Sequence, residues 1–141
     1  MTNITEDYVS FETAKLLKEK GFDEPTGFVY SENGELMKLS DFGVRYLLNS
    51  ECDDYPHWQF PFEGVASIVS APTIQMAMKW LREEHSIAIN IGWGEVFEDK
   101  YRWWCIILNC KNGDILRESE YYKTYEEACE SAIKYCLENL I

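Results

Sequence analysis

The chain has 141 residues and a mass of 16.5 kDa, which is the size of one ordinary domain. Hydrophobic residues make up 46% of the sequence and aromatic residues 15%, so the composition excludes a disordered chain and predicts a packed core. Lys and Arg number 13 against 25 Asp and Glu, giving a formal net charge of -12. This charge disfavours direct binding to nucleic acid or to an anionic membrane surface.

The chain start and the cysteines both favour a cytoplasmic protein. Residues 1–7 lack the positive charge and apolar stretch of a signal peptide, and no apolar run approaches the roughly 20 residues of a membrane span. The five cysteines are an odd number and include no CxxC pair. We therefore expect reduced, mostly buried thiols that act as small hydrophobic side chains.

The first predicted helix covers residues 11–20, with Ser10 as its N-cap and Gly21 just after its end.

The pair Asn33-Gly34 predicts a type I′ turn that closes a β-hairpin. Folding the chain about this turn places Tyr30 opposite Met37 and Phe28 opposite Leu39, which gives the hairpin one apolar face.

Residues 40–70 carry the weakest periodicity, and within them residues 51–64 predict an irregular loop because two prolines and a glycine oppose regular structure. Aromatic side chains on a proline-stiffened loop make a good contact surface. Residues 21–70 also hold nine acidic and only two basic residues. The alternative is that these aromatic side chains fold back onto the core. The candidate interaction surface consists of Tyr55, Trp58, Phe60 and Phe62.

The second predicted helix follows Ser70 as its cap, has Pro72 in its first turn and continues over Thr73–His85. A strand with one apolar face follows over residues 87–93, and an acidic turn is expected near Glu95–Lys100.

Tyr101–Lys111 predicts a strand that is apolar on both faces and therefore belongs in the middle of a covered sheet. Trp103 and Trp104 are adjacent and must point to opposite faces, so one indole is expected to need a second subunit to cover it. Asn112-Gly113 predicts a hairpin into a strand over Asp114–Ser119.

Thr124 caps the last predicted helix, Tyr125–Asn139, and opens a capping box. The complete pattern predicts one α+β domain over residues 1–141, with the element order α-β-β-α-β-β-β-α. Its sheet is expected to be mainly antiparallel and packed against helices.

Two stretches of the chain carry a resemblance. Ser70–His85 and the tail Tyr122–Ile141 resemble segments of a family of small uncharacterised proteins from anaerobic gut bacteria, their phages and their mobile elements. The resemblance implies an accessory protein of a phage or mobile element and supplies no activity, cofactor or catalytic residue.

The sequence assigns no catalytic, cofactor-binding or metal-binding residue. The two histidines are His57 and His85, and neither lies in a nucleophile motif; phosphate-binding glycine loops are absent. The metal-ligand types in residues 52–57 favour a solvated acidic loop, because no second Cys/His cluster accompanies them.

The leading functional hypothesis is a non-enzymatic interaction protein that acts through the acidic, aromatic-rich surface of residues 21–70. It is expected to bind a protein partner or a second copy of itself as a homodimer. One alternative is a small enzyme with a His and carboxylate site near His57. Another is an acidic decoy that imitates nucleic acid and occupies a basic protein.

Overall fold

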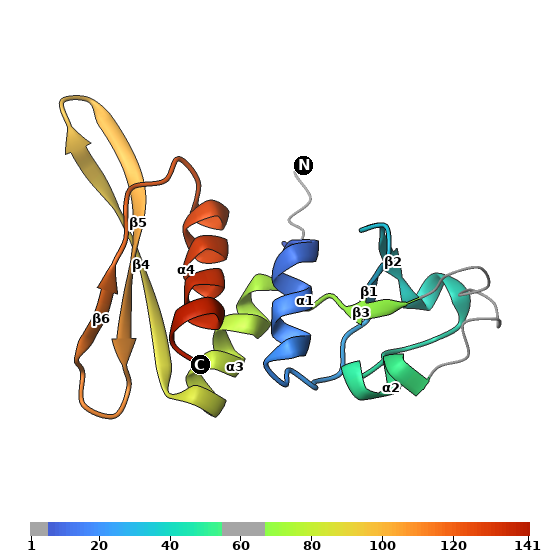
Figure 1. Cartoon of the computed structure of the whole chain (residues 1–141). Helices are drawn as coiled ribbons and strands as arrows, with labels where there is room; N and C mark the ends of the chain where they lie inside the picture. The colour runs from blue at the N-terminus through green and yellow to red at the C-terminus, as the bar shows by residue number, and fades with distance from the viewer. Residues whose placement is uncertain (1–5, 55–66) are drawn as a thin grey trace. The chain divides into compact units, whose positions relative to one another are not determined.

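The structure is a computed structural model that describes residues 6–54 and 67–141. The chain is α+β, with α-helices and two three-stranded antiparallel sheets, as predicted (Figure 1). It divides into two compact units. The N-terminal unit is Tyr8–Thr73, and the C-terminal unit combines Glu6 and Asp7 with Ile74–Ile141. The assignment of residues 1–141 to one domain stays a prediction.

The N-terminal unit contains a sheet of strand order β2-β1-β3, in which both neighbours pair antiparallel with β1. Helix α1 contacts β3. The elements are α1 (Phe11–Glu19), β1 (Phe28–Ser31), β2 (Leu36–Lys38), the 3-10 helix η1 (Leu39–Phe42), α2 (Asn49–Asp54) and β3 (Ile68–Ser70). The core cluster is formed by Val29, Leu39, Leu47, Cys52 and Ile68.

The first helix begins and ends where its capping residues predict. The Ser10 hydroxyl accepts a hydrogen bond from the backbone N–H of Thr13 at 3.2 Å, which satisfies one of the free donors of the first turn. Gly21 follows the helix with φ of +94°, a conformation that favours glycine.

The predicted register of the first hairpin is wrong by one residue. Tyr30 pairs with Leu36, and Val29 pairs with Met37. The reason is a loop of three residues instead of two: the Ser31 N–H donates to the Glu35 carbonyl, and Gly34 takes φ of +81°. A three-residue loop with its glycine in the left-handed conformation shifts every pair by one and exchanges the faces of β2.

The predicted cap at Ser70 is also wrong, because Ser70 is the last residue of β3 and helix α3 begins only at Ile74. The Ser70 N–H donates to Oδ1 of Asn49. Asn49 is buried, and its Nδ2 donates to the Phe22 carbonyl at 2.8 Å. Pairing with β1 thus holds the chain extended to residue 70. The element order otherwise follows the prediction, with α2 and β3 added between residues 40 and 70.

The C-terminal unit contains a sheet of order β4-β5-β6, with β5 in the centre as predicted for Tyr101–Lys111. Its elements are α3 (Ile74–His85), β4 (Ile87–Phe97), β5 (Lys100–Asn109), β6 (Ile115–Glu118) and α4 (Tyr125–Asn139). Helix α4 packs along one face of the sheet and also contacts α3 (Figure 1).

The core of this unit lies between α4 and the sheet. Cys105 and Ile107 of β5 are buried, and α4 supplies an apolar stripe at helical spacing. The stripe consists of Ala128, Cys129, Ala132, Ile133, Cys136 and Leu137. The Thr124 hydroxyl accepts from the Glu127 N–H at 3.1 Å, so the predicted cap of α4 is confirmed.

The β4–β5 hairpin is longer than its sequence predicts. The strands run to Phe97 and resume at Lys100, so the acidic turn contains two residues instead of six. Asp99 adopts φ of +57°, and its N–H donates to the Glu95 carboxylate, which stabilises the tight turn. A bulge between Glu95 and Phe97 accompanies it.

Candidate functional site

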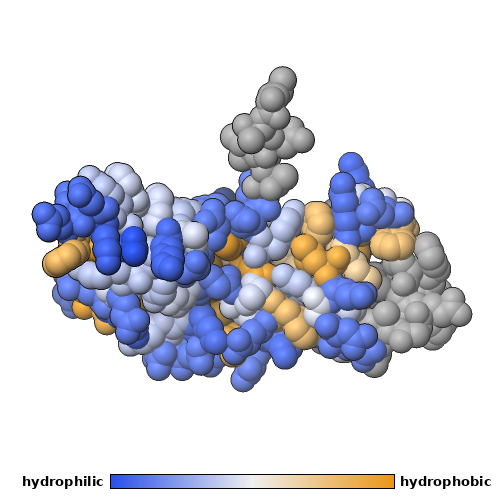
Figure 2. Space-filling model, turned by 90° about the horizontal axis from the view of Figure 1, so that it is seen from above, coloured by the Kyte–Doolittle hydropathy of each residue, from blue (hydrophilic) through white to orange (hydrophobic). Residues whose placement is uncertain are grey.

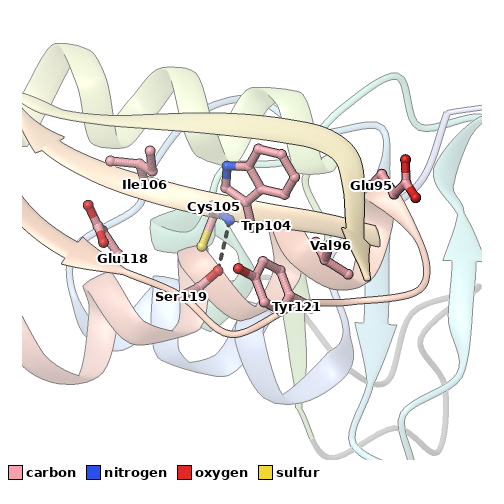
Figure 3. Close-up of a pocket in the computed structure, with 8 residues that line it drawn as sticks. All are labelled: Glu95, Val96, Trp104, Cys105, Ile106, Glu118, Ser119 and Tyr121. Carbon is pink, nitrogen blue, oxygen red and sulfur yellow. Dashed lines mark hydrogen bonds between the residues drawn. The ribbon is translucent and has the colours of Figure 1, made fainter. Parts of the chain in front are cut away.

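The candidate site is a pocket of about 380 Å³ on the face of the C-terminal sheet opposite α4, which we call the Trp104 pocket. Side chains from all three strands and from the segment after β6 contribute to it (Figure 3). Its lining residues are Glu95, Val96, Trp104, Cys105, Ile106, Glu118, Ser119 and Tyr121. Among the described elements of this unit, no helix covers this face, so the prediction that the Tyr101–Lys111 strand lies in a covered sheet is wrong for this side: Trp104, Ile106 and Leu108 are only partly buried.

Two glycines of β4 set the position of the Trp104 indole. The register places Gly92 directly opposite Trp104, and a Cβ at Gly92 would overlap the indole ring. A Cβ at Gly94 would lie 3.3 Å from the same ring. The indole therefore lies flat across two positions without side chains, where only glycine allows such a close approach. This contact leaves the other face of the ring directed toward the pocket.

Tyr121 forms the second aromatic wall of the pocket. Its ring centroid lies 6.2 Å from that of Trp104, and the ring planes meet at 84°. The backbone of the adjacent Tyr122 is fixed to β5, because Tyr122 and Trp103 exchange two hydrogen bonds of 2.7 and 2.8 Å. The Tyr121 side chain is 61% exposed, so the aromatic corner is open to a ligand.

The charged groups of the pocket are carboxylates. Figure 3 shows the two aromatic side chains between Glu118, near Ile106, and Glu95 at the other end. None of the lining residues is basic.

Two arginines of the same sheet, Arg117 and Arg102, contact other groups. The Arg117 guanidinium lies 4.0 Å from the ring centroid of Tyr135 on α4, and Arg102 donates from Nη1 to the Tyr101 carbonyl. The residues that line the pocket thus include two carboxylates and no positive group.

The hydroxyl of Ser119 is used in the fold. It accepts a hydrogen bond from the backbone N–H of Cys105 at 2.8 Å and donates one to the Glu120 carbonyl at 2.7 Å (Figure 3). It replaces a ladder partner where β6 leaves β5. A serine nucleophile needs an adjacent general base, and none of the lining residues is a histidine or a lysine. The pocket is thus suited to binding by contact and charge.

Burial makes two thiols of α4 unreactive. Desolvation raises the pKa of Cys129 to about 11 and that of Cys136 to about 12. Cys52 and Cys105 are buried too, as predicted, whereas Cys110 is exposed. The three buried thiols of the C-terminal unit therefore act as apolar side chains between the sheet and α4.

The predicted interaction surface of Tyr55, Trp58, Phe60 and Phe62 lies outside the described residues, and so does His57. That surface stays a prediction.

The second histidine, His85, lies within the described residues. The imidazole of His85 packs edge-on against the Trp80 indole at a centroid distance of 4.7 Å. Within residues 6–54 and 67–141, no group of three or more His, Cys, Asp or Glu side chains is placed to hold a metal ion.

The sequence patterns missed the contributions of Tyr121, Glu95 and Glu118 to one pocket. Trp103 and Trp104 do point to opposite faces: Trp103 contacts Tyr125 of α4, and Trp104 contacts Tyr121. The hairpin turn alone could not supply this pairing: counting outward from Phe97 and Lys100 places Gly92 opposite Cys105, and only the bulge between Glu95 and Phe97 brings it opposite Trp104. Hydropathy does not reveal the pocket either, because the surface over the β4–β5 hairpin, at the left of Figure 2, is mostly blue and pale.

No family model, curated protein or solved structure matches the chain. The resemblance of Ser70–His85 and Tyr122–Ile141 to proteins of gut bacteria and their phages therefore stays a prediction. Among the residues that the structure describes, no helix has the length and apolar character needed to cross a membrane.

Proposed function

We propose that the protein is a non-enzymatic interaction protein that binds a positively charged segment of a partner protein in the Trp104 pocket. The observation that carries this proposal is the perpendicular pair of Trp104 and Tyr121 between two glutamates. An ammonium or guanidinium group is attracted to the face of an aromatic ring, most strongly to that of tryptophan. Glu118 can add a charge-assisted hydrogen bond at one end, and Glu95, whose Oε1 accepts from the Asp99 N–H, adds negative charge at the other.

The charge of the whole chain supports the same partner. A net charge of -12 raises the local concentration of basic segments and increases their rate of association. The C-terminal unit itself provides a precedent for the contact, because Arg117 already lies over the ring of Tyr135.

The wider functional hypotheses stay proposals. A role in a phage or mobile element depends on the resemblance, and a contribution of residues 21–70 depends on their acidic and aromatic composition. The enzyme near His57 and the acidic decoy gain no support from the geometry of the Trp104 pocket.

Binding of a labelled peptide of alternating lysine and serine, measured by fluorescence anisotropy, tests the proposal. We expect tighter binding than for the matched glutamine–serine peptide. Tyr121→Ala is expected to weaken binding about threefold to tenfold, which corresponds to the loss of one cation–π contact. Glu118→Gln is expected to weaken it about threefold and to reduce its salt dependence.

Tyr46→Ala is the matched control, because Tyr46 is 56% exposed, close to the 61% of Tyr121, and does not line the pocket. It should bind the lysine peptide like the unmodified protein. Equal affinity of Tyr121→Ala and Tyr46→Ala would show that binding depends only on diffuse charge and would contradict the proposal. So would equal affinity for the lysine and glutamine peptides.

A further inference from the structure

Strand β4 lies at an edge of its sheet and offers a long row of backbone groups. It pairs with β5 on one side, and none of the described strands pairs with its other side. The strand has 11 residues, which is long for an edge strand. An unprotected edge of this length is a template for pairing with another extended chain.

The hydrogen-bond pattern identifies which groups face outward. The Cys110 N–H donates to the Ser86 carbonyl, so in an antiparallel ladder the even-numbered residues of β4 bond to β5. On the far side of β5, odd-numbered residues such as Trp103 and Cys105 bond to the segment around β6. Both observations agree. The backbone N–H and C=O groups of Ile89, Ile91 and Trp93 therefore point away from the sheet.

The usual protective features of an edge are missing from residues 87–94, because the bulge and the Glu95 charge lie at the far end of β4. Residues 87–94 contain no charged residue and no proline, although 27% of the chain is charged. Native proteins normally place lysine, proline or inward charges on such a strand. For a chain of net charge -12, this uncharged segment is also a place where a second copy can approach with little repulsion.

Exposed aromatic side chains continue the same region. Trp93 is 56% exposed, Phe97 68% and Tyr101 47%, and the rings of Trp93 and Tyr101 stack at a centroid distance of 5.1 Å. Tryptophan and tyrosine are the residues that contribute most to protein interfaces. Three aromatic side chains about half exposed offer roughly 300 Å² per copy. This is below the ~800 Å² per partner of a standard interface, so backbone pairing must supply the rest.

We infer that β4 pairs antiparallel with β4 of a second copy, joining the two three-stranded sheets into one six-stranded sheet. The charge pattern sets the register, because centring the pair on Ile91 aligns the uncharged segment with itself. Trp93 of one copy then lies opposite Ile89 of the other, and no carboxylate faces another across the pair. The small area predicts a weak dimer with a Kd in the micromolar range.

The first test is hydrogen exchange of the unmodified protein by NMR at several concentrations. We expect the N–H groups of Ile89, Ile91 and Trp93 to become protected as concentration rises. The neighbouring amide of Asn90, which points toward β5, should be protected at all concentrations. Persistent fast exchange at the three outward positions up to about 1 mM, well above a micromolar Kd, would overturn the inference. Protection that appears only when the lysine peptide is added would show that a partner strand occupies the edge, and would overturn it too.

The second test is the molar mass by sedimentation equilibrium. As the protein concentration increases, the mass should rise from 16.5 kDa toward twice that value. The Trp93→Lys variant should stay monomeric over the same concentrations. Tyr46→Lys, at an equally exposed position outside the strand, should dimerise normally. A dimer that persists unchanged in Trp93→Lys would place the interface elsewhere.

The two proposals respond oppositely to salt and can fail separately. The Kd of the dimer should decrease as salt concentration rises, because screening reduces the repulsion between two acidic chains. Peptide binding in the Trp104 pocket should weaken, because screening also reduces the attraction between opposite charges. Tyr121→Ala should weaken peptide binding as much in the Trp93→Lys background as in the unmodified protein. Tyr121→Ala alone should dimerise like the unmodified protein.

Discussion

At the scale of single residues, burial decides what the cysteines do. Five thiols in a reduced chain are compatible with metal binding, catalysis or simple packing, and their spacing does not distinguish these roles. Cys129 and Cys136 lie on the buried stripe of α4, and Cys105 lies on the sheet beneath it. Desolvation in that layer disfavours the thiolate. Packing is therefore their role in the C-terminal unit.

The raised pKa of Cys136 predicts a loss of stability in alkali. Its pKa is about 12 in the folded chain and about 9 when exposed, so between these values the unfolded chain releases a proton that the folded chain keeps. Stability from this thiol is complete below pH 9 and decreases as pH rises through the folded pKa. We expect the urea midpoint of unfolding to fall above pH 9, and to fall less steeply in Cys136→Ala. Cys110→Ala, at an exposed position, should have the slope of the unmodified protein.

At the scale of elements, local signals predicted where helices and strands form more accurately than how strands pair. Caps at Ser10 and Thr124 act through residues three positions away, so the sequence contains all that is needed. Asn33-Gly34 is also a local signal for a turn, but the dipeptide does not determine how many residues the loop contains. The three-residue loop changed the partner of Tyr30 from Met37 to Leu36. A single inserted loop residue moves every side chain of one strand to the opposite face.

The packing of Trp104 across β4 makes a prediction about this pair of strands. Gly92→Ala should displace the indole, because the new Cβ would overlap it, and we expect a loss of about 1–3 kcal/mol in the free energy of unfolding. Gly94→Ala is the control, since its Cβ would lie 3.3 Å from the ring and requires only a small shift. Urea unfolding with near-UV circular dichroism measures both effects. Equal stability of the two variants would contradict the close approach at Gly92.

At the scale of the whole molecule, the negative charge is the feature that composition makes most evident. Residues 21–70 carry most of the excess, whereas the Trp104 pocket lies in the second half of the chain. The pocket obtains its negative charge from Glu95 and Glu118, and its lining contains no basic residue. Local geometry, more than the total charge, thus selects the site for a cation.

The net charge of -12 also predicts how salt affects folding. Self-repulsion destabilises a compact acidic chain, and screening relieves it. We expect the free energy of unfolding at pH 7 to increase by about 1 kcal/mol between low salt and ~0.5 M NaCl. Urea titrations at both salt concentrations measure the change at a protein concentration below that of dimerisation. A decrease with salt would mean that attractive ion pairs outweigh the repulsion.

Local sequence patterns predicted the α+β class, the two capped helices, the central position of β5 and the opposite directions of Trp103 and Trp104. These features follow from periods of 2.0 and 3.6 residues and from capping within one turn, which depend only on neighbours in the chain. Long-range packing, by contrast, produces the pairing of β3 with β1 and brings Glu95, Trp104 and Tyr121 to one pocket. Such contacts join residues distant in sequence, and their geometry depends on loop length, bulges and the absence of a Cβ at Gly92. The net charge of -12 is therefore a property of the composition, whereas the position of the negatively charged Trp104 pocket is a property of the fold.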